Sequence, residues 1–156
     1  MKSRTTWREK LEKPQEPRVV KVPPKMSHFG QGTMLIPTPK LVDNLIRRIP
    51  KGKLVTVSEL RRRLAADFEV DVTCPLTTGI FVRIAAEAAE EDRMNGRKRI
   101  TGYWRVVKDD GTLNPKFPGG VNQQSCYLHR EELAIVRNGK KPPKVKEFER
   151  KLITLN

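Results

Sequence analysis

The spacing of apolar residues predicts three helices in the middle of the chain. The first covers about residues 39–49, where leucine and isoleucine recur at intervals of three and four before a proline. The second begins at a capping box formed by Thr56 and Glu59 and continues to about Asp67. Its apolar side carries Leu60, Leu64 and Ala65.

The third predicted helix is the longest and continues to about Met94. Thr77 or Thr78 is expected to cap it, since a threonine hydroxyl accepts a hydrogen bond from a free amide of the first turn. Asn95-Gly96 is a typical stop. The expected buried stripe consists of Ile80, Phe81, Ile84, Ala85 and Ala88.

Short β segments separate and follow these helices. Strands are expected at residues 53–57 and 102–107, and a further helix at about 121–131. A hairpin turn is predicted at Asn138-Gly139, although two prolines weaken its second arm. A last helix is predicted from the stripe formed by Val145, Phe148, Leu152 and Leu155.

Composition divides the chain into three parts. Residues 1–38 contain five prolines and little periodicity, so we expect a basic arm that runs extended over the surface, apart from an amphipathic turn at 5–12. Residues 39–136 are expected to form the folded domain, and 137–156 a basic hairpin and helix extension. The predicted fold class is mainly α with small β elements, similar to a winged-helix-like helix-turn-helix domain.

The charge of the chain favours a polyanionic partner. The 156 residues include 32 Lys+Arg and 18 Asp+Glu, which gives a formal net charge of +14. The net charge is +9 over residues 1–53, −3 over 54–94 and +8 over 95–156, so two basic blocks flank a mildly acidic middle. Such an excess on one small domain favours nucleic acid as the partner, and the alternative is a highly charged solvated surface.

Several other classes of protein are excluded by composition. No apolar run approaches the roughly 20 residues of a membrane span, and the first residues lack the apolar stretch of a signal peptide. Cys74 and Cys126 cannot form a disulfide framework, which favours a reduced, cytoplasmic and nucleoid-associated setting. His28 and His129 are the other potential metal ligands of this type, so we expect no metal site. We also expect no cofactor, and a monomer.

Four landmarks occur in order between Leu41 and Val136. They are the segment IPKGKLVT at 49–56, a pair of helices, the segment YWRVV at 103–107, and Gly119-Gly120 followed eleven residues later by Glu131. Together they resemble the C-terminal DNA-binding domain of the O6-alkylguanine-DNA alkyltransferases, over about 95 of the 156 residues. The resemblance implies the helix-turn-helix fold of that domain.

The departures from the family's pattern imply that the chain is not an enzyme. The acceptor cysteine and the histidine that activates it correspond to Tyr103 and Trp104. A phenol is a far weaker nucleophile than a thiolate at neutral pH, and an indole cannot act as a general base. Asn95 and Glu131 match the asparagine and glutamate of the family's relay, and we expect local hydrogen bonds from them and a supporting role for Arg105. The alkyltransferase-like proteins similarly lack the cysteine and bind alkylated guanine without repairing it.

Tyr103 and Trp104 can be interpreted in two ways. They can line a pocket and stack on a flipped base, or they can fill the former acceptor cavity as core. Because neighbours on a strand point in opposite directions, one of the two could line the pocket while the other packs in the core. We expect Tyr103 at the floor of a cleft beside the N-terminal end of the 77–94 helix. The family turns the target nucleotide out of the duplex with a tyrosine and an arginine finger. At the matching positions this sequence has Val57 in place of the tyrosine, and Thr77 or Thr78 near the position of the arginine.

Two groups of residues are candidate DNA contacts. Thr77, Thr78, Gly79 and Arg83 begin the candidate recognition helix, where the alternative is simple capping of a core helix. The loop residues expected near the site are Lys51, Lys53, Arg97, Lys98 and Arg99, where the alternative is a solvated charge run. The acidic end of the long helix would repel phosphate if it faced DNA; it contains Glu87, Glu90, Glu91 and Asp92.

The sequence therefore predicts a non-catalytic double-stranded DNA-binding protein of the alkyltransferase-like type that senses alkylated or damaged bases. An RNA- or ribosome-associated module that uses the same basic surface is the first alternative. An active DNA alkyltransferase that uses a displaced cysteine, Cys126 or Cys74, is the second.

Overall fold

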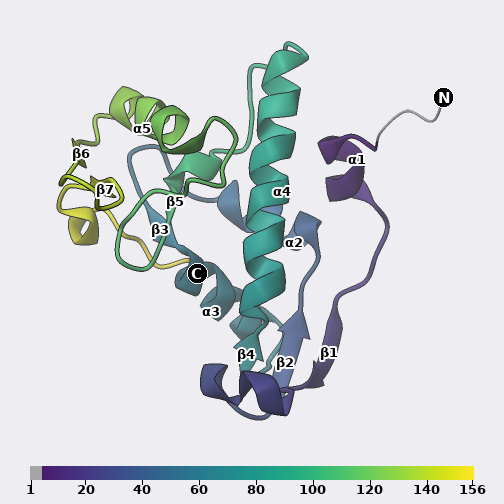
Figure 1. Ribbon diagram of the computed structural model, residues 1–156. Helices are drawn as coiled ribbons and strands as arrows, with labels where there is room; N and C mark the ends of the chain where they lie inside the picture. The colour runs from purple at the N-terminus through teal and green to yellow at the C-terminus, as the bar shows by residue number, and fades with distance from the viewer. Residues whose placement is uncertain (1–4) are drawn as a thin grey trace.

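One long helix, α4, organises the molecule. The computed structural model describes residues 5–156, and Figure 1 shows the other helices grouped around α4 (Pro75–Met94). This helix contacts α1 (Trp7–Glu12), α2 (Pro39–Ile46) and α3 (Val57–Asp67). The α4 residues that face the core include Ala85, Ala86 and Ala89, whose small side chains allow close approach.

A three-stranded sheet joins the N-terminal residues to the rest of the fold. Strand β1 (Arg18–Lys21) pairs antiparallel with β2 (Thr33–Ile36), and β2 pairs in parallel with β4 (Val72–Thr73). A 3-10 turn, η1 (Pro24–Phe29), connects β1 with β2. Since β4 directly precedes α4, this sheet anchors the start of the long helix.

Two smaller strand pairs position the C-terminal half. Strand β3 (Val55–Thr56) pairs in parallel with β5 (Val106–Val107), which brings the 3-10 turn η2 (Tyr103–Arg105) close to the core. Helix α5 (Gly120–Arg130) packs against η2. The last elements are β6 (Ile135–Val136), β7 (Lys144–Val145) and η3 (Phe148–Arg150).

The mainly helical fold with small sheets is confirmed, and so are several of the predicted elements. The helix over 57–67 begins as expected, because the Thr56 hydroxyl accepts a hydrogen bond from the Glu59 amide at 3.2 Å. The capping box is only half made, since the Glu59 carboxylate accepts from Arg62 and from the Leu155 amide instead. The hairpin near Asn138 is present as the antiparallel pair β6–β7.

The predicted N-terminal arm forms regular elements over residues 5–38, and residues 1–4 of that arm lie outside the described residues. The amphipathic turn is confirmed as α1, where Thr6 accepts from the Glu9 amide at 3.0 Å and Leu11 is buried. The chain then forms β1, η1 and β2. These strands form because β2 finds hydrogen-bond partners on both sides, β1 and the distant β4.

The start and the buried face of the long helix also differ from the prediction. Helix α4 begins at Pro75, so neither predicted threonine caps it, and the Thr78 hydroxyl donates to the Cys74 carbonyl at 2.7 Å. Ile80, predicted to be buried, is 56% exposed. Val82 and the alanines of α4 are buried, so the side of the helix that carries Ile80 faces solvent.

The strand predicted at 102–107 is confirmed only for its two valines, and the last predicted helix is wrong. Residues 103–105 form a 3-10 turn, and only Val106 and Val107 form a strand. The helix over 145–155 is replaced by β7, η3 and a terminal segment in which Leu54 accepts from the Ile153 amide at 3.0 Å. Glu147 adopts a left-handed conformation with φ 52°, which interrupts any helix there.

Candidate nucleic-acid interface

A basic cleft lies where the C-terminal end of α4, the turn η2 and the C-terminal end of α5 meet. We call it the Trp104 cleft, and its volume is about 360 Å³. It is lined by Lys51, Arg93, Arg97, Lys98, Ile100, Trp104, Arg105, Tyr127, Arg130 and Glu131. Six of these side chains are cationic and a single one, Glu131, is a carboxylate, so the cleft suits an anionic ligand.

Two stacked aromatic rings form the floor of the cleft. The rings of Trp104 and Tyr127 are nearly parallel, with centroids 4.1 Å apart and an interplanar angle of 11°. Arg105 lies over the Trp104 ring at 5.4 Å, and Arg130 lies over the Tyr127 ring at 5.5 Å. These cation–π contacts place positive charge beside an apolar surface, an arrangement that suits a base with its phosphate.

Glu131 joins three parts of the cleft region through hydrogen bonds to its carboxylate. Its carboxylate accepts from the Trp104 indole N–H at 2.6 Å, from the Gly52 amide at 2.7 Å and from Arg105 Nη2 at 2.8 Å. Burial alone would raise the pKa of Glu131, but the hydrogen bonds from Arg105, Gly52 and Trp104 outweigh it and hold this pKa below its ordinary value. The carboxylate is therefore ionised and fully engaged at neutral pH.

Glu131 makes the local hydrogen bonds expected of it, and the contacts of Arg105 are those of a supporting residue. Arg105 binds Glu131 and also donates from Nη1 to the Ile49 carbonyl at 2.9 Å, so its role is structural. Asn95 is exposed at the C-terminal end of α4 and does not line the cleft. The prediction of Asn95 as a pocket residue is wrong, because α4 ends there and its side chain remains in solvent.

Tyr103 is core, and the prediction that it lines the pocket is wrong. Its side chain has no exposed surface, and its hydroxyl donates to Glu90 at 2.7 Å. Burial, followed by the hydrogen bond to Glu90, raises the pKa of Tyr103 above its ordinary value. Trp104 lines the cleft, whereas Tyr103 packs against Phe117 and Tyr127.

The predicted position of Tyr103 along the long helix is also wrong. Glu90, which holds its hydroxyl, lies in the C-terminal half of α4, four residues from the end of that helix. The same carboxylate accepts from Tyr127 and from Arg93, both at 2.7 Å. Burial would raise the pKa of Glu90, but the hydrogen bonds from Tyr127, Arg93 and Tyr103 lower it, so an ionised carboxylate holds the rings in place.

The structure separates the predicted DNA contacts into two groups. Lys51, Arg97 and Lys98 line the Trp104 cleft, whereas Lys53 and Arg99 are exposed but lie outside its lining. Thr77, Thr78, Gly79 and Arg83 lie in the other half of α4. Gly79 is 14 residues before Arg93, which corresponds to about 21 Å along a helix. Thr78 is fully buried, so its side chain cannot reach a phosphate.

Four residues of the cleft were missed by the sequence reasoning. Arg93, Ile100, Tyr127 and Arg130 all line it. A signal for Tyr127 was available, because it lies four residues before Glu131 and therefore on the same side of the predicted helix. Arg93 precedes Arg97 by the same interval, but α4 ends between them, so spacing alone could not bring them together.

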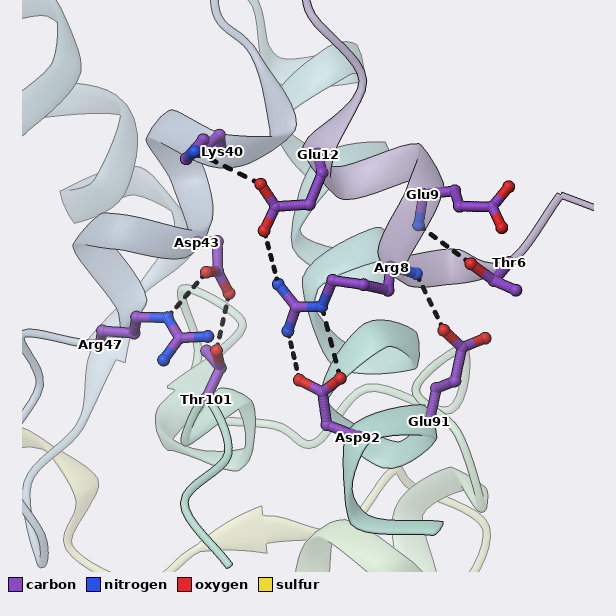
Figure 2. A network of polar contacts seen from close by, with 10 residues as sticks. All are labelled: Thr6, Arg8, Glu9, Glu12, Lys40, Asp43, Arg47, Glu91, Asp92 and Thr101. Atoms are coloured by element: carbon purple, nitrogen blue, oxygen red, sulfur yellow. Dashed lines mark hydrogen bonds and ion pairs between the residues drawn. The ribbon is translucent and has the colours of Figure 1, made fainter. Parts of the chain in front are cut away.

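Three acidic residues near the end of α4 are bound by other groups of the fold. The Glu91 carboxylate accepts from the amides of Trp7 and Arg8, and the Arg8 guanidinium pairs with buried Asp92. Figure 2 shows Arg8 of α1 between Glu12 and Asp92. With Glu90 also engaged, three of the four acidic residues expected to repel phosphate are bound to other protein groups.

The cysteines lie away from the cleft. Cys74 is buried before α4, and Cys126 is exposed on α5 without lining the cleft. Within residues 5–156, no group of His, Cys, Asp and Glu side chains could hold a metal ion. No helix in that same range has the length and apolar character needed to cross a membrane.

The arrangement of helices and small sheets is similar to that of alkyltransferase-like proteins. The structure resembles the crystal structure of S. pombe Atl1 in complex with damaged DNA containing O6-carboxymethylguanine. The TM-score is 0.52 and the sequence identity 17%, over 75% of this chain and 94% of that chain. No family model and no curated protein matches the sequence. The alkyltransferase resemblance is thus confirmed as a likeness of fold.

Proposed function

We propose that the protein binds double-stranded DNA without reacting with it, as a non-catalytic protein of the alkyltransferase-like type. The observation that carries this proposal is the Trp104 cleft, where six cationic side chains surround an aromatic floor on a fold shared with Atl1. Helices α3 and α4 serve as the helix-turn-helix pair of a winged-helix-like domain in this proposal.

Those cationic side chains of the cleft that have no carboxylate partner bind phosphates. Lys51, Arg97 and Lys98 are exposed and form no ion pair with a carboxylate within residues 5–156, so they are available to a ligand. Since phosphate contacts dominate the affinity of proteins for duplex DNA, they contribute most of the binding energy. A base that leaves the stack would contact the small part of Trp104 that remains exposed in the cleft, 8% of its surface.

Several observations support a role without covalent chemistry. The Tyr103 hydroxyl is buried and bound to Glu90, and its raised pKa removes the phenolate that a nucleophile would need. The Trp104 indole is a hydrogen-bond donor engaged with Glu131. Cys126 is exposed on α5 and is not among the residues that line the cleft.

A damaged base would contact Trp104 in this proposal, because Tyr103 has no exposed surface. Selectivity for damage then depends on how easily a base leaves the stack, since a modified or mismatched base unpairs at a lower free-energy cost. Alkylated guanine is the lesion that the resemblance to Atl1 suggests.

A binding experiment with a matched control tests the proposal. Fluorescence anisotropy would compare a duplex with one O6-methylguanine and the same duplex without it. We expect Lys98→Ala to weaken both complexes equally, because a phosphate contact carries no base information. Lys21→Ala, on the exposed edge of β1 away from the cleft, should leave both unchanged. No duplex binding at low salt, or equal loss from both variants, would contradict the proposal.

Two further measurements separate the alternatives. Structured RNA that displaces the duplex at equal concentration would favour the RNA-associated module. Intact-protein mass spectrometry after incubation with the O6-methylguanine duplex should show an unchanged mass. A gain equal to one methyl group on any residue would make the protein an alkyltransferase.

A further inference from the structure

The connection between β1 and β2 forms a tip that is fixed beside β4. We call residues 24–32 the η1 tip, and Figure 1 shows it at the lower end of the molecule, next to β4. Gly30 has a φ of 137°, and a Cβ there would stand 2.5 Å from a Val72 methyl group of β4. Only glycine therefore lets the tip approach this strand so closely. The Asp71 carboxylate adds a second link, since it accepts from the Thr33 amide at 2.8 Å.

Arg61 of α3 connects the η1 tip to the start of α4. Its guanidinium lies 5.8 Å from the centroid of the Phe29 ring, and its Nε donates to the Thr73 carbonyl at 3.1 Å. Thr73 is the last residue of β4, and α4 begins two residues later. The Phe29 ring also contacts the His28 ring, with centroids 4.0 Å apart. The tip, α3 and the start of α4 thus share one side of the molecule.

The exposed groups of the η1 tip are cationic and aromatic. Phe29 is 38% exposed and is the single aromatic among the exposed large apolar side chains of residues 5–156. Lys25 is exposed and forms no ion pair within that range. Between residues 17 and 42 the sequence has four lysines and arginines and no aspartate or glutamate. Asp71 is the carboxylate beside the tip, and the Thr33 amide and hydroxyl both bind it.

We infer that the η1 tip contacts the sugar–phosphate backbone of duplex DNA beside the start of α4, with Lys25 on a phosphate and Phe29 against a deoxyribose. Contacts of this kind fix the orientation of a duplex and carry no sequence information. The phosphate attracts the unpaired lysine, and the C–H face of the sugar removes an exposed aromatic ring from water. No side chain enters the base stack. This inference rests on the proposed function and adds a contact from residues that precede the predicted 39–136 domain.

One duplex can reach both the η1 tip and the Trp104 cleft. Pro75, at the start of α4, is 18 residues before Arg93, which corresponds to about 27 Å along the helix. This separation equals about 8 base pairs at roughly 3.4 Å each, and a duplex of about 20 base pairs is roughly 68 Å long. Loss of the tip contact should therefore weaken binding without removing the contact at the cleft.

Photo-crosslinking tests whether the tip faces DNA. In the full chain, Phe29→p-benzoylphenylalanine places a ketone that reacts under light with C–H bonds, which deoxyribose offers. We expect a protein–DNA product with a labelled 20-base-pair duplex. Val19→p-benzoylphenylalanine is the matched control, because Val19 is 53% exposed on β1, and β2 separates β1 from β4 and the start of α4. It should give no product.

Lys25→Ala measures the phosphate contact. Each phosphate contact contributes about 0.9 to the slope of the logarithm of the binding constant against the logarithm of the salt concentration. The slope for Lys25→Ala should therefore be shallower than that of wild type by about 0.9, equally for intact and O6-methylguanine duplexes. Lys25→Arg keeps the charge and should keep the wild-type slope. Circular dichroism verifies that each variant is folded.

The outcomes distinguish this contact from the proposed function. Wild-type binding with no product from position 29, or with an unchanged slope in Lys25→Ala, overturns the tip contact and leaves the proposed function intact. Equal yields from positions 29 and 19 also overturn the tip contact. Absence of duplex binding by the wild type overturns both. A crosslink from position 29 to another protein chain instead of DNA would assign the tip to a second copy of this chain.

Discussion

Removal of the Glu131 carboxylate is expected to destabilise the fold strongly, because this group is the common acceptor of a structural hydrogen-bond network. In Glu131→Ala, Trp104 and Gly52 lose the acceptor of their N–H groups, and Arg105 loses its counter-ion. The side chains of Arg105 and Glu131 are 17% and 5% exposed, so water replaces these bonds only in part.

The magnitude follows from the groups left without partners. Breaking a buried ion pair by removing one member costs about 3–5 kcal/mol, and each unsatisfied buried donor costs about 1–3 kcal/mol. The network borders an open cleft, which admits some water, so we expect a decrease of about 3 kcal/mol in the free energy of unfolding. Glu131→Gln keeps the shape and one acceptor oxygen, and should cost about 1–2 kcal/mol.

The effect of this substitution depends on pH in a defined direction. The pKa of Glu131 is lowered in the folded state, so the unfolded chain binds its proton more readily. Its contribution is therefore fully present above the unfolded value of about 4.3 and is lost as the pH falls through the folded pKa. The difference between wild type and Glu131→Ala should be largest at neutral pH and should shrink in acid.

Urea unfolding followed by circular dichroism measures this difference at neutral and acidic pH. Glu149→Ala is the control, because Glu149 is exposed and forms no ion pair within residues 5–156, and its midpoint should match wild type. A loss below about 1 kcal/mol for Glu131→Ala at neutral pH would refute the reasoning, since it would mean that water satisfies the network. A loss that stays constant in acid would refute the ionised state of Glu131.

Three other predictions concern the core, the N-terminal helix and the basic surface. Tyr103→Phe should cost about 1–2 kcal/mol in thermal or urea unfolding through the lost hydrogen bond to Glu90, and should not change the preference between damaged and intact duplex. Arg8→Ala should cost about 1–3 kcal/mol by leaving buried Asp92 without its partner, whereas Arg150→Ala, at an exposed 3.8 Å pair, should have no measurable effect on the urea midpoint. If about five phosphates are contacted, the logarithm of the DNA-binding constant should fall with the logarithm of the salt concentration at a slope near −4 to −5. An affinity that does not change with salt in anisotropy titrations would mean that the protein does not contact phosphates.

Local sequence was sufficient for the elements whose stabilising contacts are local. The Thr56 cap and the Leu60 and Leu64 positions predicted α3, because a cap and a helical stripe depend on residues within one turn. The basic character of residues 51–53 and 97–99 also followed directly from the sequence. The roles of Glu131 and Arg105 were anticipated through the family resemblance, because both positions match its landmarks.

The tertiary structure alone decided which residues face the cleft. Tyr103 is held in the core by Glu90 of α4, and Trp104 is held at the cleft by Glu131 at the end of α5. The apolar stripe at 145–155 predicted a helix, and the helix is absent because residues 151 and 153 pair with the backbone of Leu54 instead. The spacing of apolar residues indicates that a segment is buried. The conformation of that segment and the direction of its side chains are determined by hydrogen-bond partners far along the chain.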